Sequence, residues 1–191
     1  MKTENKINST TEDYVCSCTT EDYTHSNTLG DYAHSITTGY KANSSTQGYR
    51  AHSSTTDERA HSSTTGNKAH SSTLGNESHS YTTGIGANSS TLGDEANSNT
   101  TGDQAHSSTL GYKSLSSTTG KNSISVSCGI KGKAKTTRGF IFIVDWRFNE
   151  QEGWYIHNTH TAMVGNKIEG KTIKPNYWYW FEDGILMEKK T

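Results

Sequence analysis

Histidine offers the most prominent chemistry in this sequence, because it recurs at intervals of nine residues or a multiple of nine. Imidazoles in such a column can bind a metal ion or respond to pH. A metal site would also need carboxylates or cysteines that converge on it, so we interpret the column as an outward polar ladder and expect no metal or other cofactor. The ladder comprises His25, His34, His52, His61, His70, His79 and His106, with Asn43, Asn88 and Asn97 in other repeats.

A second set of reactive side chains lies near the C-terminus. His157, His160, Asp145 and Glu182 include acids and bases of the types that enzymes use. No nucleophile and no glycine-rich loop accompanies them, and both would be expected around an active site. The sequence therefore predicts a protein that is not an enzyme.

The three cysteines are an odd number without the spacing of a zinc site. Cys16 and Cys18 should lie on the same face of one strand, where neighbours rarely form a disulfide. We expect them and Cys128 to be free thiols, as in a reducing compartment. Calcium is not expected either, because the calcium-binding nonapeptide roll needs paired glycines and a regular Asp.

Five tyrosines near the N-terminus occupy places that we expect to be turns: Tyr14, Tyr23, Tyr32, Tyr40 and Tyr49. Aromatic side chains at corners suit the binding of sugars or of a protein partner. The alternative is that they only shield the open N-terminal end of the fold. We keep them as candidate binding residues.

The element that must position all these side chains is a nine-residue repeat, which runs through fifteen units from Lys6 to Phe140 without a slip. Counting Lys6 as repeat position 1, serine dominates position 3, threonine position 5 and glycine position 7. Positions 1, 3 and 5 are uniform while 2, 4 and 6 vary, and a period of two is typical of a strand. Glycine at position 7 and polar residues at 8 and 9 then form the turn.

One nine-residue unit is too short to close a coil, so we expect two units per coil in a two-sheet parallel β-solenoid, or β-roll. Two faces could form the interior: the uniform positions 1, 3 and 5, or positions 2, 4 and 6, which hold the few apolar residues of the array. We favour positions 1, 3 and 5, which give a thin interior of Ala, Ser and Thr. Leu74, Leu92 and Leu110 recur every eighteen residues at position 6 and would then lie outside. We expect these leucines to contact either the C-terminal domain or other protomers, and because the interior buries little apolar surface, a homotrimer or another oligomer would help considerably.

The composition changes after residue 139. Apolar and aromatic segments follow, and they contain all four tryptophans. Their pattern predicts a small antiparallel meander with a turn at Asp183 and Gly184. We expect a nonapeptide solenoid over residues 1–139 and an aromatic-rich β domain over 140–191 that covers the last coil, whose edge would otherwise recruit other chains.

Two segments carry a resemblance: SISVSCGIKGKAKTTRGFIFIVDW (Ser123 to Trp146) and VGNKIEGKTIKPNYWYWFEDGILMEK (Val164 to Lys189). They resemble the C-terminal part of phage and prophage proteins of gut bacteria, in which a Ser/Thr/Ala/Gly nonapeptide array precedes a β module of the type KIKPxxWYxxxDG. This chain departs from the family in its His- and Asn-rich units and in TTRG at the junction. The resemblance implies a phage or mobile-element origin and no known activity.

The net charge of -1 argues against partners that bind basic surfaces, namely nucleic acids and membranes. The first 14 residues lack the apolar core of a signal peptide, so we expect a virion or host-cytoplasmic protein that is not classically secreted. Three functions remain. The first is a structural or adhesive rod, the second is an intracellular phage protein that inhibits a host factor, and the third is an ice- or carbohydrate-binding solenoid.

Overall fold

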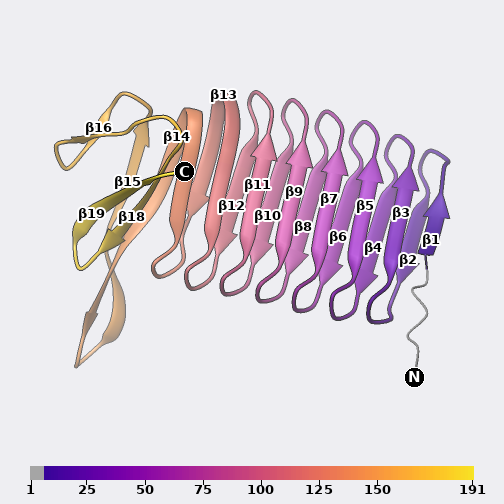
Figure 1. Ribbon diagram of the computed structural model, residues 1–191, viewed down its shortest axis with the longest axis horizontal. Helices are drawn as coiled ribbons and strands as arrows, with labels where there is room; N and C mark the ends of the chain where they lie inside the picture. Colours follow the sequence, from indigo (N-terminus) through magenta and orange to yellow (C-terminus); the bar gives the residue numbers. More distant parts are fainter. Residues whose placement is uncertain (1–6) are drawn as a thin grey trace.

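The computed structural model describes residues 7–191, and all their regular elements are strands (Figure 1). Twelve short strands follow one another along a rod. The odd-numbered ones are β1 (Ile7–Thr10), β3 (His25–Leu29), β5 (Asn43–Gln47), β7 (His61–Thr65), β9 (His79–Thr83) and β11 (Asn97–Thr101). The even-numbered ones are β2 (Cys16–Thr19), β4 (His34–Thr38), β6 (His52–Thr56), β8 (His70–Leu74), β10 (Asn88–Leu92) and β12 (His106–Leu110).

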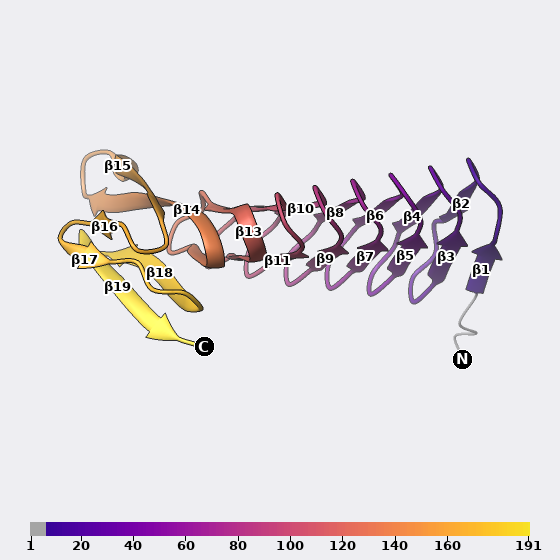
Figure 2. The ribbon, with the colours of Figure 1, turned by 90° about the horizontal axis from the view of Figure 1, so that it is seen from above.

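Each strand pairs in parallel with the strand eighteen residues away. His25 of β3 lies beside Asn43 of β5, and His34 of β4 lies beside His52 of β6. The odd-numbered strands therefore form one sheet and the even-numbered strands another, and the two layers are visible in Figure 2. We call them the odd sheet and the even sheet. The predicted β-solenoid with two units per coil is confirmed.

Two longer strands complete the solenoid. The first half of β13 (Leu115–Ser127) pairs with β11 and its second half with β12. β14 (Lys133–Asn149) follows β13 through both sheets, with two register shifts where the chain turns the corner. Their pairing offset falls from eighteen residues at Leu115 and Lys133 to sixteen at Ile124 and Phe140. The last corner is thus two residues shorter than the others.

The interior consists of hydroxyl and methyl groups, as the uniformity of positions 1, 3 and 5 predicted. Ser107 is typical, because its hydroxyl donates to the carbonyl of Ser98 at 2.8 Å and lies 2.9 Å from the Ser98 hydroxyl. These serines are nine residues apart, on opposite sheets, so the hydroxyls bridge the two layers. Position 5 acts similarly, since Thr64 donates to the carbonyl of His70 at 2.8 Å. These bonds offset the cost of burying polar groups.

Each corner is stabilised by bonds from coil to coil. The side-chain oxygen of Asp94, at position 8, accepts the backbone N–H of Tyr112 in the next coil at 2.7 Å. Asn76 does the same for the N–H of Asp94 at 2.8 Å. Glycine is needed at position 7 because a Cβ on Gly93 would press against the carbonyl oxygen of Gly75. Position 9 adopts a left-handed conformation, with φ of 54° at Glu95.

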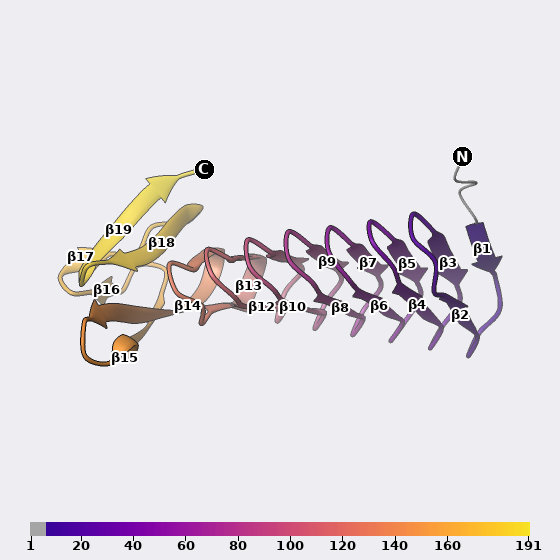
Figure 3. The ribbon, with the colours of Figure 1, turned by 90° about the horizontal axis from the view of Figure 1, so that it is seen from below.

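The C-terminal region covers the last coil. Its strands are β15 (Gly153–Met163), β16 (Lys167–Ile168), β17 (Lys171–Thr172), β18 (Tyr177–Glu182) and β19 (Ile185–Lys190). β15 pairs antiparallel with the second half of β14, which lies in the even sheet, and β18 pairs with its first half, which lies in the odd sheet. Figure 3 shows β15 and the β18–β19 hairpin on the two sides of the rod's end. We call β15–β19 the cap.

The cap encloses an apolar core, in contrast to the solenoid. The core contains Ala134, Ile141, Ile143, Ala162, Ile168, Ile173, Tyr179, Phe181 and Leu186. The predicted antiparallel cap and its turn at Asp183 and Gly184 are confirmed, and the structure adds that the two hairpins extend different sheets. The boundary between residues 139 and 140 stays a prediction, and it falls inside β14, which both regions share.

Candidate functional site

The histidine column divides into two ladders, one on each outer face. His25, Asn43, His61, His79 and Asn97 lie on the odd sheet, and His34, His52, His70, Asn88 and His106 lie on the even sheet. Neighbouring rings stack nearly parallel, with centroids 4.8 Å apart in the three pairs His34–His52, His52–His70 and His61–His79. Asn43 contacts Nδ1 of His25 at 3.2 Å. The predicted outward polar ladder is confirmed.

Burial within the ladders lowers the pKa of four of these imidazoles. Burial lowers the pKa of His52, and the neighbouring His70 and His34 lower it further, because a proton on one ring repels a proton on the next. Burial likewise lowers the pKa of His61, His70 and His79. Residues 7–191 contain no group of three or more His, Cys, Asp or Glu side chains that could hold a metal ion.

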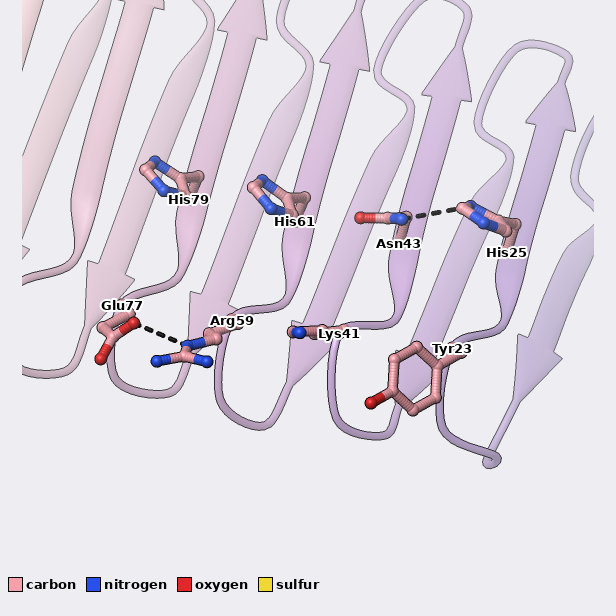
Figure 4. A pocket seen from close by; sticks show the side chains of 8 residues that line it. All are labelled: Tyr23, His25, Lys41, Asn43, Arg59, His61, Glu77 and His79. Atoms are coloured by element: carbon pink, nitrogen blue, oxygen red, sulfur yellow. Dashed lines mark hydrogen bonds and ion pairs between the residues drawn. The ribbon is translucent and has the colours of Figure 1, made fainter. Parts of the chain in front are cut away.

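A groove runs along the odd sheet between its histidine ladder and the adjacent corner (Figure 4). We call it the odd groove; its volume is about 530 Å³. It is lined by Tyr23, His25, Lys41, Asn43, Arg59, His61, Glu77 and His79. Arg59 bonds to Glu77 at 2.6 Å and donates to the Tyr40 hydroxyl at 3.2 Å, so its charge is neutralised inside the groove.

The equivalent groove on the even sheet has a volume of about 490 Å³, and we call it the even groove. It is lined by Tyr32, His34, Arg50, His52, Lys68, His70 and Gly86. The Arg50 guanidinium lies 5.8 Å from the ring centre of Tyr32, and the Lys68 ammonium lies 6.0 Å from that of Tyr49. Neither cation forms an ion pair within the described part of the chain.

The five candidate tyrosines do not form one cluster. Tyr14, Tyr32 and Tyr49 follow odd strands and line one edge of the rod, whereas Tyr23 and Tyr40 line the other edge. Tyr14 and Tyr32 stack at 4.9 Å, and Tyr32 meets Tyr49 edge to face at 5.8 Å. Tyr23 and Tyr40 meet edge to face at 5.7 Å. Their binding role stays a prediction, and any ligand would contact one edge's tyrosines rather than all five.

The three candidate interface leucines lie side by side on the even sheet. Leu92 pairs with Leu74 on one side and with Leu110 on the other. Their exposed fractions are 47% for Leu74, 46% for Leu92 and 52% for Leu110. They border a groove of about 450 Å³ that also includes Tyr112, Cys128, Ile130 and Trp146. We call these three leucines the leucine row.

The structure does not unite the acid and base residues of the C-terminal region. Asp145 is fully buried and bonds to Arg147 at 2.9 Å, while its second oxygen has no hydrogen-bond partner among residues 7–191. His160 stacks on Phe181 at 4.4 Å. His157 and Glu182 are exposed. No hydrogen bond or ion pair joins any two of the four candidates in residues 7–191.

The three cysteines are free, as predicted. The sulfur atoms of Cys16 and Cys18 lie 2.8 Å apart on the exposed face of β2. The hydrogen bond from Cys18 and partial burial raise the pKa of Cys16 to about 11. Burial also raises the pKa of Cys128. Protonated thiols are poor nucleophiles and poor metal ligands at neutral pH.

One cluster escaped the sequence reasoning, because it joins distant parts of the chain. Lys133 lies 4.0 Å from the ring centre of Trp180, and Lys135 lies 4.5 Å from that of Trp178. The lysines belong to β14 and the tryptophans to β18. The sequence contained one indication of this cluster: Lys133 and Lys135 alternate with smaller residues, so they share one face of a strand.

Comparisons with protein-family models, with curated proteins and with solved structures return no match to this chain. Among residues 7–191, no helix is long and apolar enough to cross a membrane.

Proposed function

We propose that this protein is a non-enzymatic structural or adhesive rod of phage or mobile-element origin, and that copies associate through the leucine row. The observation that carries the proposal is the row itself. Three half-exposed leucines in register are unusual on a surface whose other outward positions are mainly Ser, Thr, His and Asn. Apolar patches of this kind are typical of protein interfaces.

The leucines alone would not hold two copies together. Fully burying a leucine contributes about 1.5–3 kcal/mol, so covering the exposed half of three contributes about 2–4 kcal/mol in total. Association costs about 4–15 kcal/mol in lost translation and rotation. The interface must therefore extend to the apolar side chains beside the row, which are Tyr112, Ile130 and Trp146.

A second copy is the occupant that fits best. The even sheet presents identical side chains at the pitch of one coil, so a second even sheet can place its own leucines between them. Three rods around a common axis, or another closed assembly, would cover every copy's row equally. This arrangement also compensates for the solenoid interior, which buries little apolar surface.

Size-exclusion chromatography with light scattering tests the proposal on the full chain. We expect the wild type to be an oligomer and Leu92→Asp to be a monomer, because a carboxylate in the interface would lose its hydration. The control is Thr65→Asp, which places the same charge at the same repeat position on the odd sheet. Circular dichroism confirms that both variants stay folded.

Either of two results would reject the proposal. A wild type that is monomeric at tens of micromolar would place the row in solvent and favour the alternative function, inhibition of a host factor. An oligomer that Thr65→Asp dissociates as readily as Leu92→Asp would show that association does not depend specifically on the leucine row.

A further inference from the structure

The two grooves are built from the same repeat positions but differ in charge balance. Positions 2 and 9 line both grooves, on opposite faces of the rod. In the odd groove Arg59 forms an ion pair with Glu77 at 2.6 Å, so a carboxylate of the same groove balances the charge of the arginine. In the even groove neither Arg50 nor Lys68 forms an ion pair among the described residues, and their cationic groups lie 5.4–6.0 Å from tyrosine ring centres. The even groove thus carries two cations without a carboxylate.

The histidine ladder of the even groove presents ring edges rather than ring faces. His34, His52 and His70 stack at 4.8 Å with interplanar angles of 9° and 8°, so each face of His52 is covered by a neighbour. Figure 4 shows the same edge-on arrangement for His61 and His79 in the odd groove. A row of imidazole edges offers hydrogen-bond donors and acceptors at the pitch of the coils.

We propose that the even groove binds an acidic polysaccharide, whose chain lies along the rod axis. Arg50 and Lys68 would pair with the carboxylates of uronic acid residues. His34, His52 and His70 would exchange hydrogen bonds with sugar hydroxyls, which are donors and acceptors as neutral imidazole is. The 4.8 Å pitch is close to the advance of one sugar residue in an extended chain.

The aromatic side chain of the groove supports a sugar ligand. Tyr32 lies at the end of the groove nearer the N-terminus, partly exposed, with Arg50 against its ring. Because Tyr14 stacks on the Tyr32 ring at 4.9 Å, Tyr32 offers a sugar its ring edge and hydroxyl group, which can exchange hydrogen bonds with sugar hydroxyls. This places Tyr32 at the ligand's end and the two cations along its length.

A nucleic acid fits the groove less well. Proteins that bind single strands stack the bases on aromatic faces, and the ladder's faces are already covered by each other. Two cations would also leave most phosphates of a bound strand without a partner. A polymer with one carboxylate on each sugar has a lower charge density and many more hydroxyls.

The site deepens the adhesive role proposed above but is tested separately from it. The even groove involves β4, β6 and β8 at repeat positions 2 and 9, whereas the leucine row involves β8, β10 and β12 at position 6. The two surfaces lie at opposite margins of the even sheet. A variant in one surface should leave the other measurement unchanged.

The proposal predicts that binding strengthens on acidification. Around the ladder lie Tyr32, Arg50 and Lys68 from the corner, and Cys16 and Asn88 from neighbouring strands. Asp31, the nearest acid of that corner, accepts the N–H of Tyr49 at 2.8 Å. Burial lowers the pKa of His52 and of His70 below the ordinary histidine value. A bound carboxylate would favour their protonated forms, so affinity should rise as the pH falls.

Isothermal titration calorimetry with oligogalacturonate of defined length provides the test, with neutral oligogalactan and polyphosphate as comparison ligands. We expect oligogalacturonate to bind the wild type, and Arg50→Ala with Lys68→Ala together to weaken binding by about tenfold or more. The matched control is Lys41→Ala, which removes a cation from the same repeat position in the odd groove and should change the affinity less than about twofold.

Several outcomes would contradict the proposal that the even groove binds an acidic polysaccharide. These are no binding of oligogalacturonate, equal weakening by Lys41→Ala, or binding of polyphosphate as tight as that of the sugar acid. Affinity for oligogalacturonate should also increase between about pH 7.5 and pH 5.5, where its carboxylates stay ionised and imidazoles gain protons. An affinity that falls on acidification contradicts the role of the histidine ladder. Light scattering of the same variants shows whether self-association is intact.

Discussion

The solenoid encloses hydroxyl and methyl groups, whereas the cap encloses branched and aromatic hydrocarbon, and one strand, β14, passes through both. At its start β14 contributes Thr136 to the interior of the last coil, where the hydroxyl lies 3.0 Å from that of Thr118. Further along it contributes Ile141 and Ile143 to the apolar core. The same extended backbone is therefore stabilised in two different ways.

The difference shows what repetition makes possible. A buried hydroxyl is stabilising only when a partner stands at the correct distance. In the solenoid that partner is the equivalent side chain of a neighbouring unit, so the same hydrogen bonds recur along the rod. The cap has no repeat, and hydrocarbon packing tolerates irregular geometry better than a hydrogen-bond network does.

The largest expected effect is in the cap. Phe181→Ala should lower the free energy of unfolding by about 3–5 kcal/mol, because Phe181 is buried against His160 and the apolar core. Guanidinium denaturation followed by tryptophan fluorescence measures it, since all four tryptophans lie between residues 146 and 180. Phe148→Ala, at a side chain that is 59% exposed, should cost about 1 kcal/mol or less. Equal losses in both variants would contradict the assigned core.

A smaller effect is expected in the solenoid interior. Ser107→Ala removes the acceptor of the hydroxyl of Ser116 at 2.9 Å and of the N–H of Ser117 at 3.3 Å. The cost should be about 1–3 kcal/mol, because the substitution removes these bonds and the one that Ser107 donates to the Ser98 carbonyl from a buried site. Far-UV circular dichroism during denaturation reports it. The outward neighbour Ser108→Ala should be nearly neutral, and a similar loss there would argue against a hydrogen-bonded interior.

The smallest expected effect is a change of folding stability with pH, caused by the histidine ladders on the outer faces. The unfolded chain binds protons at the ordinary histidine pKa of 6.5, and the folded ladder binds them only at lower pH. Stability should therefore be complete above about pH 6.5 and fall as the pH drops from there toward the lowered pKa values. His52→Asn, which copies the residue found at Asn88, should reduce the fall in melting temperature on acidification. An unchanged pH dependence would show that the stacked rings do not resist protonation.

Much of the solenoid was predictable because the same pattern of residue types recurs in fifteen successive nine-residue units. Gly93 and its equivalents identify the corners, and the alternation around Ser107 and Thr109 identifies the inward face. The ladder of His52 and the outward place of Leu92 follow from the same register. The cap was predictable only as an antiparallel unit. Nothing in the sequence after Phe140 indicates that β14 belongs to both sheets and pairs with a different cap strand in each.

The candidate sites were predictable only in part. The sequence placed Tyr32 and Tyr40 together as corner residues, and the structure separates them onto opposite edges because alternate units belong to opposite sheets. Only the structure shows that Arg59 pairs with Glu77 and that Arg50 has no such carboxylate partner in the described part of the chain. Neighbours in a groove are eighteen residues apart, a distance at which charges show no obvious pattern in the sequence.

The sequence by itself determined the two-unit coil and its register, and it favoured the inward face that the structure shows, because a nine-residue repeat imposes one local conformation on every unit. Only the tertiary structure decided how the two grooves differ in charge and how β15 and β18 extend different sheets. The physical reason is that these features depend on which unrelated side chains meet across the stacked coils, and no local repeat encodes those contacts.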